Sequence, residues 1–87
     1  MPEISRFLGI IIRMFFDDHN PPHFHAEFQE FKAAIGIKNA ELLEGYLPSK
    51  QLKLVQAWAI IHEAELLNNF TRLGEDHKSW NKIDTLQ

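Results

Sequence analysis

The chain has 87 residues, of which 45% are hydrophobic and 11% aromatic, and it carries a formal net charge of −3 at pH 7. This size and apolar content predict one folded domain over residues 1–87, because one core can form and a second cannot. The nine Lys and Arg residues are scattered, so general nucleic-acid binding is disfavoured and only a small local site stays open, while the absence of cysteine excludes disulfides and thiolate metal sites.

The first element in chain order is the apolar stretch FLGIIIRMFF at residues 7–16. It is rich in β-branched and aromatic residues, so it predicts one strand over about residues 6–16. Side chains alternate along a strand, and one face of this strand is expected in the core. That face carries Leu8, Ile10, Ile12, Met14 and Phe16, and the other carries Gly9, Ile11, Arg13 and Phe15.

Two further strands are predicted at about residues 22–29 and 31–38, joined by a turn at Gln29 and Glu30. Gln-Glu is poor chemistry for a two-residue turn, so a longer or bulged turn stays open. The register pairs Phe28 with Phe31, Glu27 with Lys32, Ala26 with Ala33, His25 with Ala34 and His23 with Gly36. Glu27 and Lys32 are then expected to form a cross-strand ion pair, and the histidines face residues with almost no side chain.

The second half of the chain predicts a short edge strand at 41–45, one helix over about 48–73 and a tail at 74–87. Apolar residues form a stripe along this helix that is wider than a surface helix needs. The stripe consists of Leu52, Leu54, Val55, Trp58, Ala59, Ile61, Leu66, Phe70 and Leu73. We therefore predict an α+β fold, in which an antiparallel three- to four-stranded meander sheet packs against one long C-terminal helix. The expected core includes Ile10, Ile12, Phe24, Ala26, Phe28, Ile35 and Val55.

The segment DDHNPPHFHAEF, residues 17–28, is the best candidate for a functional site. His23 and His25 are separated by one residue on a strand, so they point the same way at about 7 Å spacing and could bind one ion. Imidazoles with a carboxylate suit Zn, Mn, Fe or Ni, although no cofactor is certain. The candidate metal ligands are His23, His25, Glu27, Asp17 and His19.

Other interpretations of the histidine row, His23 and His25, stay open, and one of them is a histidine-mediated interface or pH response. His23 and His25 could act as general acid and base in a ribonuclease-like enzyme, with Arg13 stabilising a phosphate. They could also be the solvent-facing half of an amphipathic strand, with no function of their own. His62 lies within the apolar stripe, where a histidine bonded to the backbone or a carboxylate is the more frequent outcome. Because Gly-rich phosphate loops and the common hydrolase and metalloprotease motifs are absent, whether the protein is an enzyme stays undecided.

Nearly the whole chain resembles the small prokaryotic family DUF4160. The resemblance rests on the opening MPEISRFLGIIIRMFFDDHNPPHFHAEF, on ELLEGYLP, on LKLVQAWAIIHEAELLNNF and on the final KIDTL, with NPPHFHAEF as the hallmark. Family members usually end in Ile-x-Pro-Leu, where this chain has Ile83-Asp84-Thr85-Leu86. The resemblance implies a short stand-alone protein, often encoded beside another small protein in an arrangement similar to toxin-antitoxin pairs. It transfers no catalytic residue.

These observations lead to one main functional expectation and one alternative. The main expectation is a protein-binding component of a toxin-antitoxin-like two-gene system, whose partner is a protein encoded nearby, a second copy of the chain, or both. The alternative is a metal-binding or ribonuclease-like protein that uses the histidine row. The N-terminus lacks a signal-peptide pattern and no apolar run is long enough to span a membrane, so we expect a cytoplasmic protein without a membrane partner.

Overall fold

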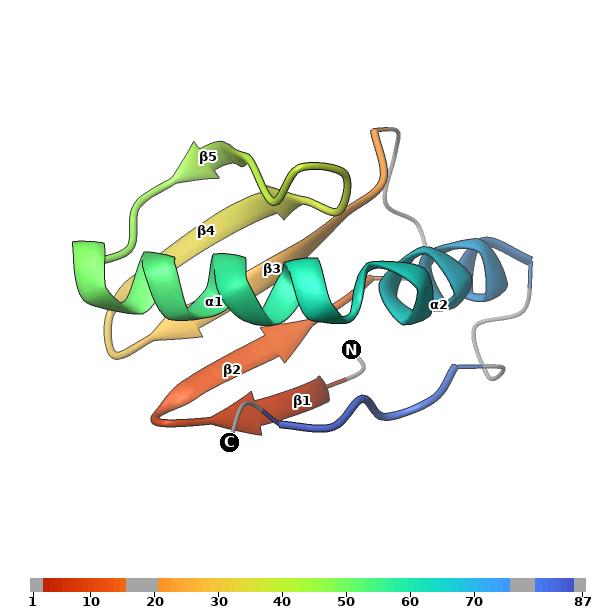
Figure 1. Ribbon diagram of the computed structural model, residues 1–87, viewed down its shortest axis with the longest axis horizontal. Helices are drawn as coiled ribbons and strands as arrows, with labels where there is room; N and C mark the ends of the chain where they lie inside the picture. Colours follow the sequence, from red (N-terminus) through yellow and green to blue (C-terminus); the bar gives the residue numbers. More distant parts are fainter. Residues whose placement is uncertain (1–2, 16–20, 76–79, 86–87) are drawn as a thin grey trace.

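The computed structural model describes residues 3–15, 21–75 and 80–85. In these residues the chain forms an antiparallel sheet followed by two helices, so the α+β prediction is confirmed (Figure 1). The elements are β1 (Glu3–Phe7), β2 (Ile10–Arg13), β3 (His23–Phe28), β4 (Phe31–Gly36), β5 (Leu42–Gly45), α1 (Ser49–Ile61) and α2 (Glu63–Glu75). The strands lie in the order β1-β2-β3-β4-β5, which is a meander as predicted, with five strands in place of three or four.

The helices and the sheet form two layers. Helix α1 lies across one face of the sheet, and α2 continues past the end of the strands (Figure 1). Apolar side chains from alternate strand positions fill the space under α1, because alternate side chains of a strand point to the same face. We call the opposite face, which is turned away from α1, the far face. It carries Arg6, Ile11, Arg13, His23, His25, Glu27, Lys32 and Ala34.

The single strand predicted at 6–16 is wrong, because the chain turns back within it. Leu8 and Gly9 form a two-residue turn between the paired residues Phe7 and Ile10. Their φ angles are 51° and 78°, which glycine adopts without steric cost and which suit the twist of a hairpin. Leu8 is consequently 64% exposed at the tip and does not reach the core. Ile10, Ile12 and Met14 are buried as predicted, and Phe16 lies outside the described residues.

The hairpin of β3 and β4 confirms the predicted register at every position. Phe28 pairs with Phe31, and His23 pairs with Gly36. The turn is the short one, and Gln29 adopts a φ of 54° to make it. Phe24, Ala26 and Ile35 are fully buried, whereas Phe28 is only partly buried because it lies at the turn end of the strand.

The single helix predicted at 48–73 is also wrong, since the helix is interrupted at His62. The main-chain angles of His62 are φ −109° and ψ 24°, although its N–H still donates to Trp58 and its carbonyl accepts from Leu66. The Nδ1 atom of His62 lies 2.6 Å from a carboxylate oxygen of Glu65 in the first turn of α2. The change of direction lets α1 follow the sheet while α2 packs against its end. Ile61, which we placed in the apolar stripe, is 67% exposed.

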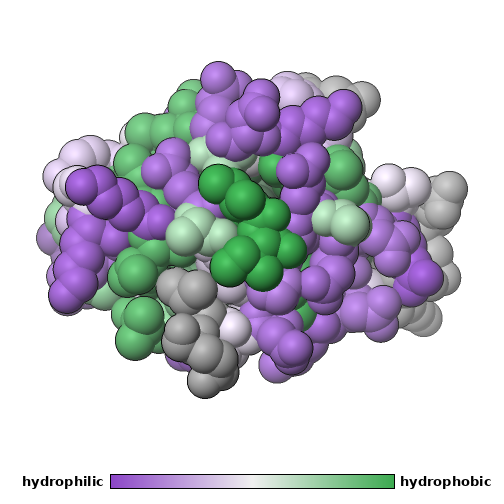
Figure 2. Space-filling model, viewed as in Figure 1, coloured by the Kyte–Doolittle hydropathy of each residue, from purple (hydrophilic) through white to green (hydrophobic). Residues whose placement is uncertain are grey.

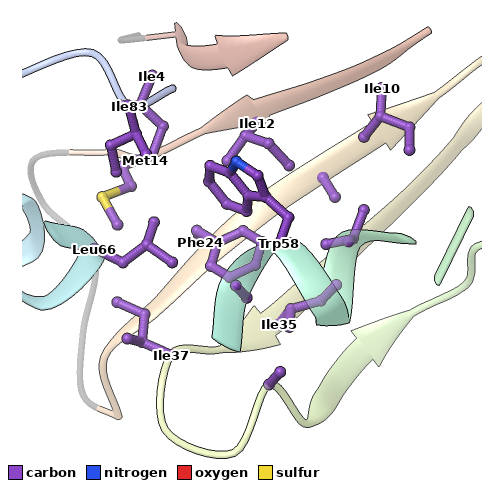
Figure 3. Close-up of a cluster of buried hydrophobic side chains, with 14 of the residues drawn as sticks. Ile4, Ile10, Ile12, Met14, Phe24, Ile35, Ile37, Trp58, Leu66 and Ile83 are labelled. Atoms are coloured by element: carbon purple, nitrogen blue, oxygen red, sulfur yellow. The ribbon is translucent and has the colours of Figure 1, made fainter. Parts of the chain in front are cut away.

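The last described segment, residues 80–85, lies beside β1 (Figure 1). Ile83 donates a 2.8 Å hydrogen bond from its main-chain N–H to the carbonyl of Ile4, and its side chain is buried. Trp58 reaches from α1 into the core, where it lies with Ile12 and Phe24, and its Nε1 donates to the Asp84 carbonyl at 2.8 Å (Figure 3). Neither α1 nor α2, the helices of the described residues, is long and apolar enough to cross a membrane.

Candidate functional site

The histidine row lies where the sequence predicts it. His23, His25 and Glu27 of β3 share the far face, because Phe24 and Ala26 between them point into the core and are fully buried. Each of the three is partly buried. The row is therefore accessible to a ligand, and it stands on a rigid central strand.

Neighbouring strands bring a guanidinium and a small residue to His25. Strand pairing places His25 directly between Arg13 of β2 and Ala34 of β4. Arg13, which the acid-base interpretation expects to stabilise a phosphate, thus lies beside His25. The ring of Phe15 meets the His25 ring edge-on, with 4.5 Å between centroids. The imidazole of His25 is therefore packed against an aromatic ring, and its neighbour in β4 is the small side chain of Ala34.

The ring of His23 is oriented by a main-chain carbonyl. Its Nδ1 lies 2.8 Å from the oxygen of Pro21. A carbonyl oxygen can only accept a hydrogen bond, so Nδ1 carries the proton and the lone pair of the neutral ring is on Nε2. The ring centroids of His23 and His25 are 5.1 Å apart, and Phe70 of α2 approaches the His23 ring at 6.0 Å.

The carboxylate of Glu27 pairs with Arg13, where we expected Lys32. The Arg13 Nε atom is 3.2 Å from Glu27 Oε2, and about a quarter of each side chain is exposed. Lys32 stands directly opposite Glu27 in the ladder, but it forms no ion pair within the described residues. Lys32 is solvent-exposed, and a mobile ammonium in water gains less from a carboxylate than a half-buried guanidinium does.

The metal prediction stays a prediction, because only three of its five candidate ligands lie in the described residues. Among residues 3–15, 21–75 and 80–85, no three His, Asp or Glu side chains group closely enough to hold an ion. His23 and His25 are brought together, but Glu27 is engaged by Arg13. Asp17 and His19 lie outside the described residues. The described part of the site therefore offers two imidazoles beside an ion pair.

A groove of about 210 Å³ lies over β4, between His25 of β3 and Glu44 of β5. The groove forms because the side chain of Ala34, at its base, is too small to fill the space between its neighbours. The groove is lined by His25, Lys32, Ala33, Ala34, Glu44 and Gly45. An imidazole, an ammonium and a carboxylate thus line one shallow groove.

A second ion pair lies toward the β1 edge of the sheet. Arg6 donates two hydrogen bonds to the Glu3 carboxylate, at 2.7 and 3.0 Å. The hydrogen bonding from Arg6 holds the pKa of Glu3 below its ordinary value, and the positive charges of Arg6, Lys82 and Arg13 act in the same direction. This pair was not predicted, because the first strand was expected to begin at about residue 6 and residues 3–5 were placed outside it.

The exposed pair Ile60 and Ile61 was also missed. Trp58 and Ala59, just before them, are fully buried. Successive helical residues are about 100° apart, so four consecutive apolar residues cannot all face one sheet. The sequence WAII therefore contained the signal that some of its members face solvent. His62 follows the frequent outcome that we expected, because its ring bonds Glu65 and contacts Trp58 at 5.4 Å.

The comparisons with known proteins give a family but no relative of known activity. Residues 9–71 match the family described as Domain of unknown function (DUF4160). No curated protein and no solved structure matches. Because the match covers most of the chain, including the histidine row and α1, this protein belongs to the DUF4160 family.

Proposed function

We propose that this protein acts by binding another protein, as one component of a two-gene system of the toxin-antitoxin type. The observation that supports the proposal is the exposure of two adjacent isoleucines at the end of α1. Ile60 is 65% exposed and Ile61 is 67% exposed. Figure 2 shows strongly hydrophobic atoms at the centre of the helix layer, with hydrophilic residues to their right and below them.

Two exposed β-branched apolar side chains cost free energy in water and gain it at an interface. Burying an isoleucine side chain is worth about 1.5–3 kcal/mol. An apolar patch rimmed by polar residues is typical of a protein-binding surface. Since Val55, Trp58 and Ala59 already hold α1 on the sheet, folding does not require Ile60 and Ile61 to be apolar.

Co-expression with the protein encoded beside it tests this function. A tagged wild-type chain is expected to retain that neighbour on affinity purification, and expression of one gene without the other is expected to change growth. The double variant Ile60→Gln and Ile61→Gln is expected to lose the neighbour while folding normally. Leu8→Gln is the matched control, because Leu8 is 64% exposed but lies at the tip of the β1–β2 turn. Wild-type protein that retains no neighbour, with no growth effect of either gene, would overturn the proposal.

A second candidate function uses the histidine row as a weak transition-metal site. It is supported by the hydrogen bond between His23 Nδ1 and the Pro21 carbonyl, since metal-binding histidines usually donate their other N–H to such a group. His23 and His25 would hold the ion, which would supply Lewis-acid chemistry when bound. Calorimetric titration of Zn and Ni into wild type, His23→Ala and His25→Ala tests it. Equal binding by all three proteins would contradict it.

The acid-base version of the same site requires Arg13 to stabilise a phosphate. In the described structure Arg13 pairs with Glu27, so a phosphate would have to compete with a carboxylate already in place. A His25→Ala variant as toxic as wild type in a growth assay would contradict this version.

A further inference from the structure

The two edges of the sheet differ in how they are covered. At the β1 edge, the segment 80–85 runs alongside the strand and Ile83 bonds to Ile4 (Figure 1). At the other edge, β5 has a strand on one side only, namely β4. An edge strand presents main-chain N–H and C=O groups that another extended chain can bind.

The β5 edge also exposes apolar side chains. All four residues of β5 are exposed, with Leu42 and Leu43 each at 40%. Tyr46, just after the strand, is 59% exposed and packs its ring on Phe31 at 5.3 Å. A strand added at this edge could therefore gain both main-chain hydrogen bonds and apolar contacts.

The charges on this edge specify which kind of strand would fit. Glu41 and Glu44 are exposed, and neither forms an ion pair in the described structure. Lys32 lines the same groove as Glu44 without pairing with it there. A second copy of this chain, paired antiparallel through β5, would bring the four carboxylates of two copies into one short interface. Like charges across such a ladder are destabilising, so self-pairing is disfavoured.

We propose that the β5 edge binds an extended segment of a partner protein as a sixth strand, and that this segment alternates Lys or Arg with apolar residues. The register shift between the Ala34–Glu44 and Ile35–Leu42 pairs leaves Leu43 as an extra residue, so Glu41 and Glu44 lie on the same face of the edge. The basic side chains face these two carboxylates, and the apolar ones cover Leu42 or Tyr46 on the other face. This inference rests on the proposed protein-binding function and names a second contact surface for it.

Short synthetic peptides test the edge without any knowledge of the partner. The probe is a peptide of alternating valine and lysine, compared with one of valine and glutamate. The valine-lysine peptide is expected to bind and to shift the amide NMR signals of residues 41–46. The same peptide with N-methylated main-chain amides is expected not to bind, because it cannot form a ladder.

Charge reversal separates edge recognition from general attraction to an acidic protein. The variant Glu41→Lys with Glu44→Lys is expected to bind the valine-lysine peptide about tenfold more weakly and to bind the valine-glutamate peptide instead. Glu30→Lys is the control, since Glu30 is equally exposed but lies in the β3–β4 turn, and it is expected to bind like wild type. Equal binding by the Glu41/Glu44 variant, or by the N-methylated peptide, would overturn the inference.

Two further outcomes identify other occupants or surfaces. Concentration-dependent self-association of the free protein that Leu43→Lys abolishes would make a second copy the occupant and overturn the inference. Peptide-induced NMR shifts confined to Ile60 and Ile61 would also overturn it. Failure of the proposed function gives a different result from failure of this inference. If the proposed function fails, the wild-type chain does not retain the protein encoded beside it on affinity purification. Failure of this inference alone leaves the neighbour bound to the Glu41/Glu44 variant as tightly as to wild type.

Discussion

The side chain of Asn69 in α2 forms two hydrogen bonds with the main chain of Asn81. Its Nδ2 donates to the Asn81 carbonyl at 2.7 Å, and its Oδ1 accepts from the Asn81 N–H at 2.9 Å. Asn69 is 1% exposed, so these bonds are made in a site largely closed to water. The side-chain amide of Asn69 thus bonds both main-chain groups of Asn81, as a paired strand would. These bonds join α2 to the segment 80–85, which lies beside β1.

Asn69→Ala is expected to lower the free energy of unfolding by about 1–3 kcal/mol, because two hydrogen bonds are lost and main-chain groups are left without partners. Asn81→Ala is the matched control, since both bonds use the main chain of residue 81 and its side chain is exposed. Urea denaturation of the two variants and wild type measures the difference. Equal destabilisation by both substitutions would show that the side-chain bonds of Asn69 contribute little.

Gly45→Ala is expected to destabilise the protein by about 2 kcal/mol or more. Gly45 has a φ of +84°, and a Cβ added to it would lie 2.3 Å from the carbonyl oxygen of Lys32 and 3.0 Å from the Ala33 Cα. These are main-chain atoms of β4, so relief requires β5 to separate from its neighbour. Faster amide hydrogen exchange in β5, together with urea denaturation, measures the effect.

Gly36→Ala provides the contrasting substitution in the neighbouring strand. A Cβ at Gly36 would meet its nearest atoms at 3.6–3.7 Å, which is ordinary van der Waals contact. We expect the free energy of unfolding to change by no more than about 1 kcal/mol, because the substitution strains nothing and reduces the freedom of the unfolded chain. A large loss of stability here would mean that the space between Gly36 and the side chain of Leu43 is smaller than the structure indicates.

The β3–β4 hairpin could be predicted from the sequence because strict alternation of apolar and polar residues fixes both faces and the register together. The β1–β2 turn could not, because Gly9 stands inside a continuous apolar run and Leu8 looks like a core residue. Periodicity also could not locate the interruption of the helix at His62. That interruption is a change of main-chain angles at one residue, and the spacing of apolar side chains does not record it.

The candidate site was predictable at the level of the strand but not of the side chain. Alternation placed His23, His25 and Glu27 on one face, and pairing brought Arg13 beside His25. The choice of Glu27 between Arg13 and Lys32 depends on side-chain reach and on how much water surrounds each cation. Neither quantity follows from strand register, which only states which Cα atoms are opposite.

Arg6→Gln is expected to raise the pKa of Glu3 toward its ordinary value. In the wild type, the hydrogen bonding from Arg6 lowers this pKa, so the pair stabilises the fold above the pKa of Glu3 in the unfolded chain. That stabilisation is lost as the pH falls through the lower, folded-state pKa. Wild type and variant should therefore differ slightly in stability at neutral pH and converge in strong acid. NMR titration of the Glu3 side chain measures the pKa, and Lys50→Gln, which removes the same charge elsewhere, should leave it unchanged.

A double-mutant cycle decides which cation Glu27 uses. Substituting Arg13→Gln and Glu27→Gln separately and together is expected to give a coupling free energy of about 0.2–1 kcal/mol, because the pair is close but partly exposed to water. The same cycle with Lys32→Gln and Glu27→Gln should give a coupling near zero, although these two residues are directly opposite in the ladder. Urea denaturation at low salt measures both cycles, and added salt should reduce the first because it screens the charges. A larger coupling with Lys32 would mean that Arg13 is available to an anion beside His25, which would favour the acid-base version of the histidine site.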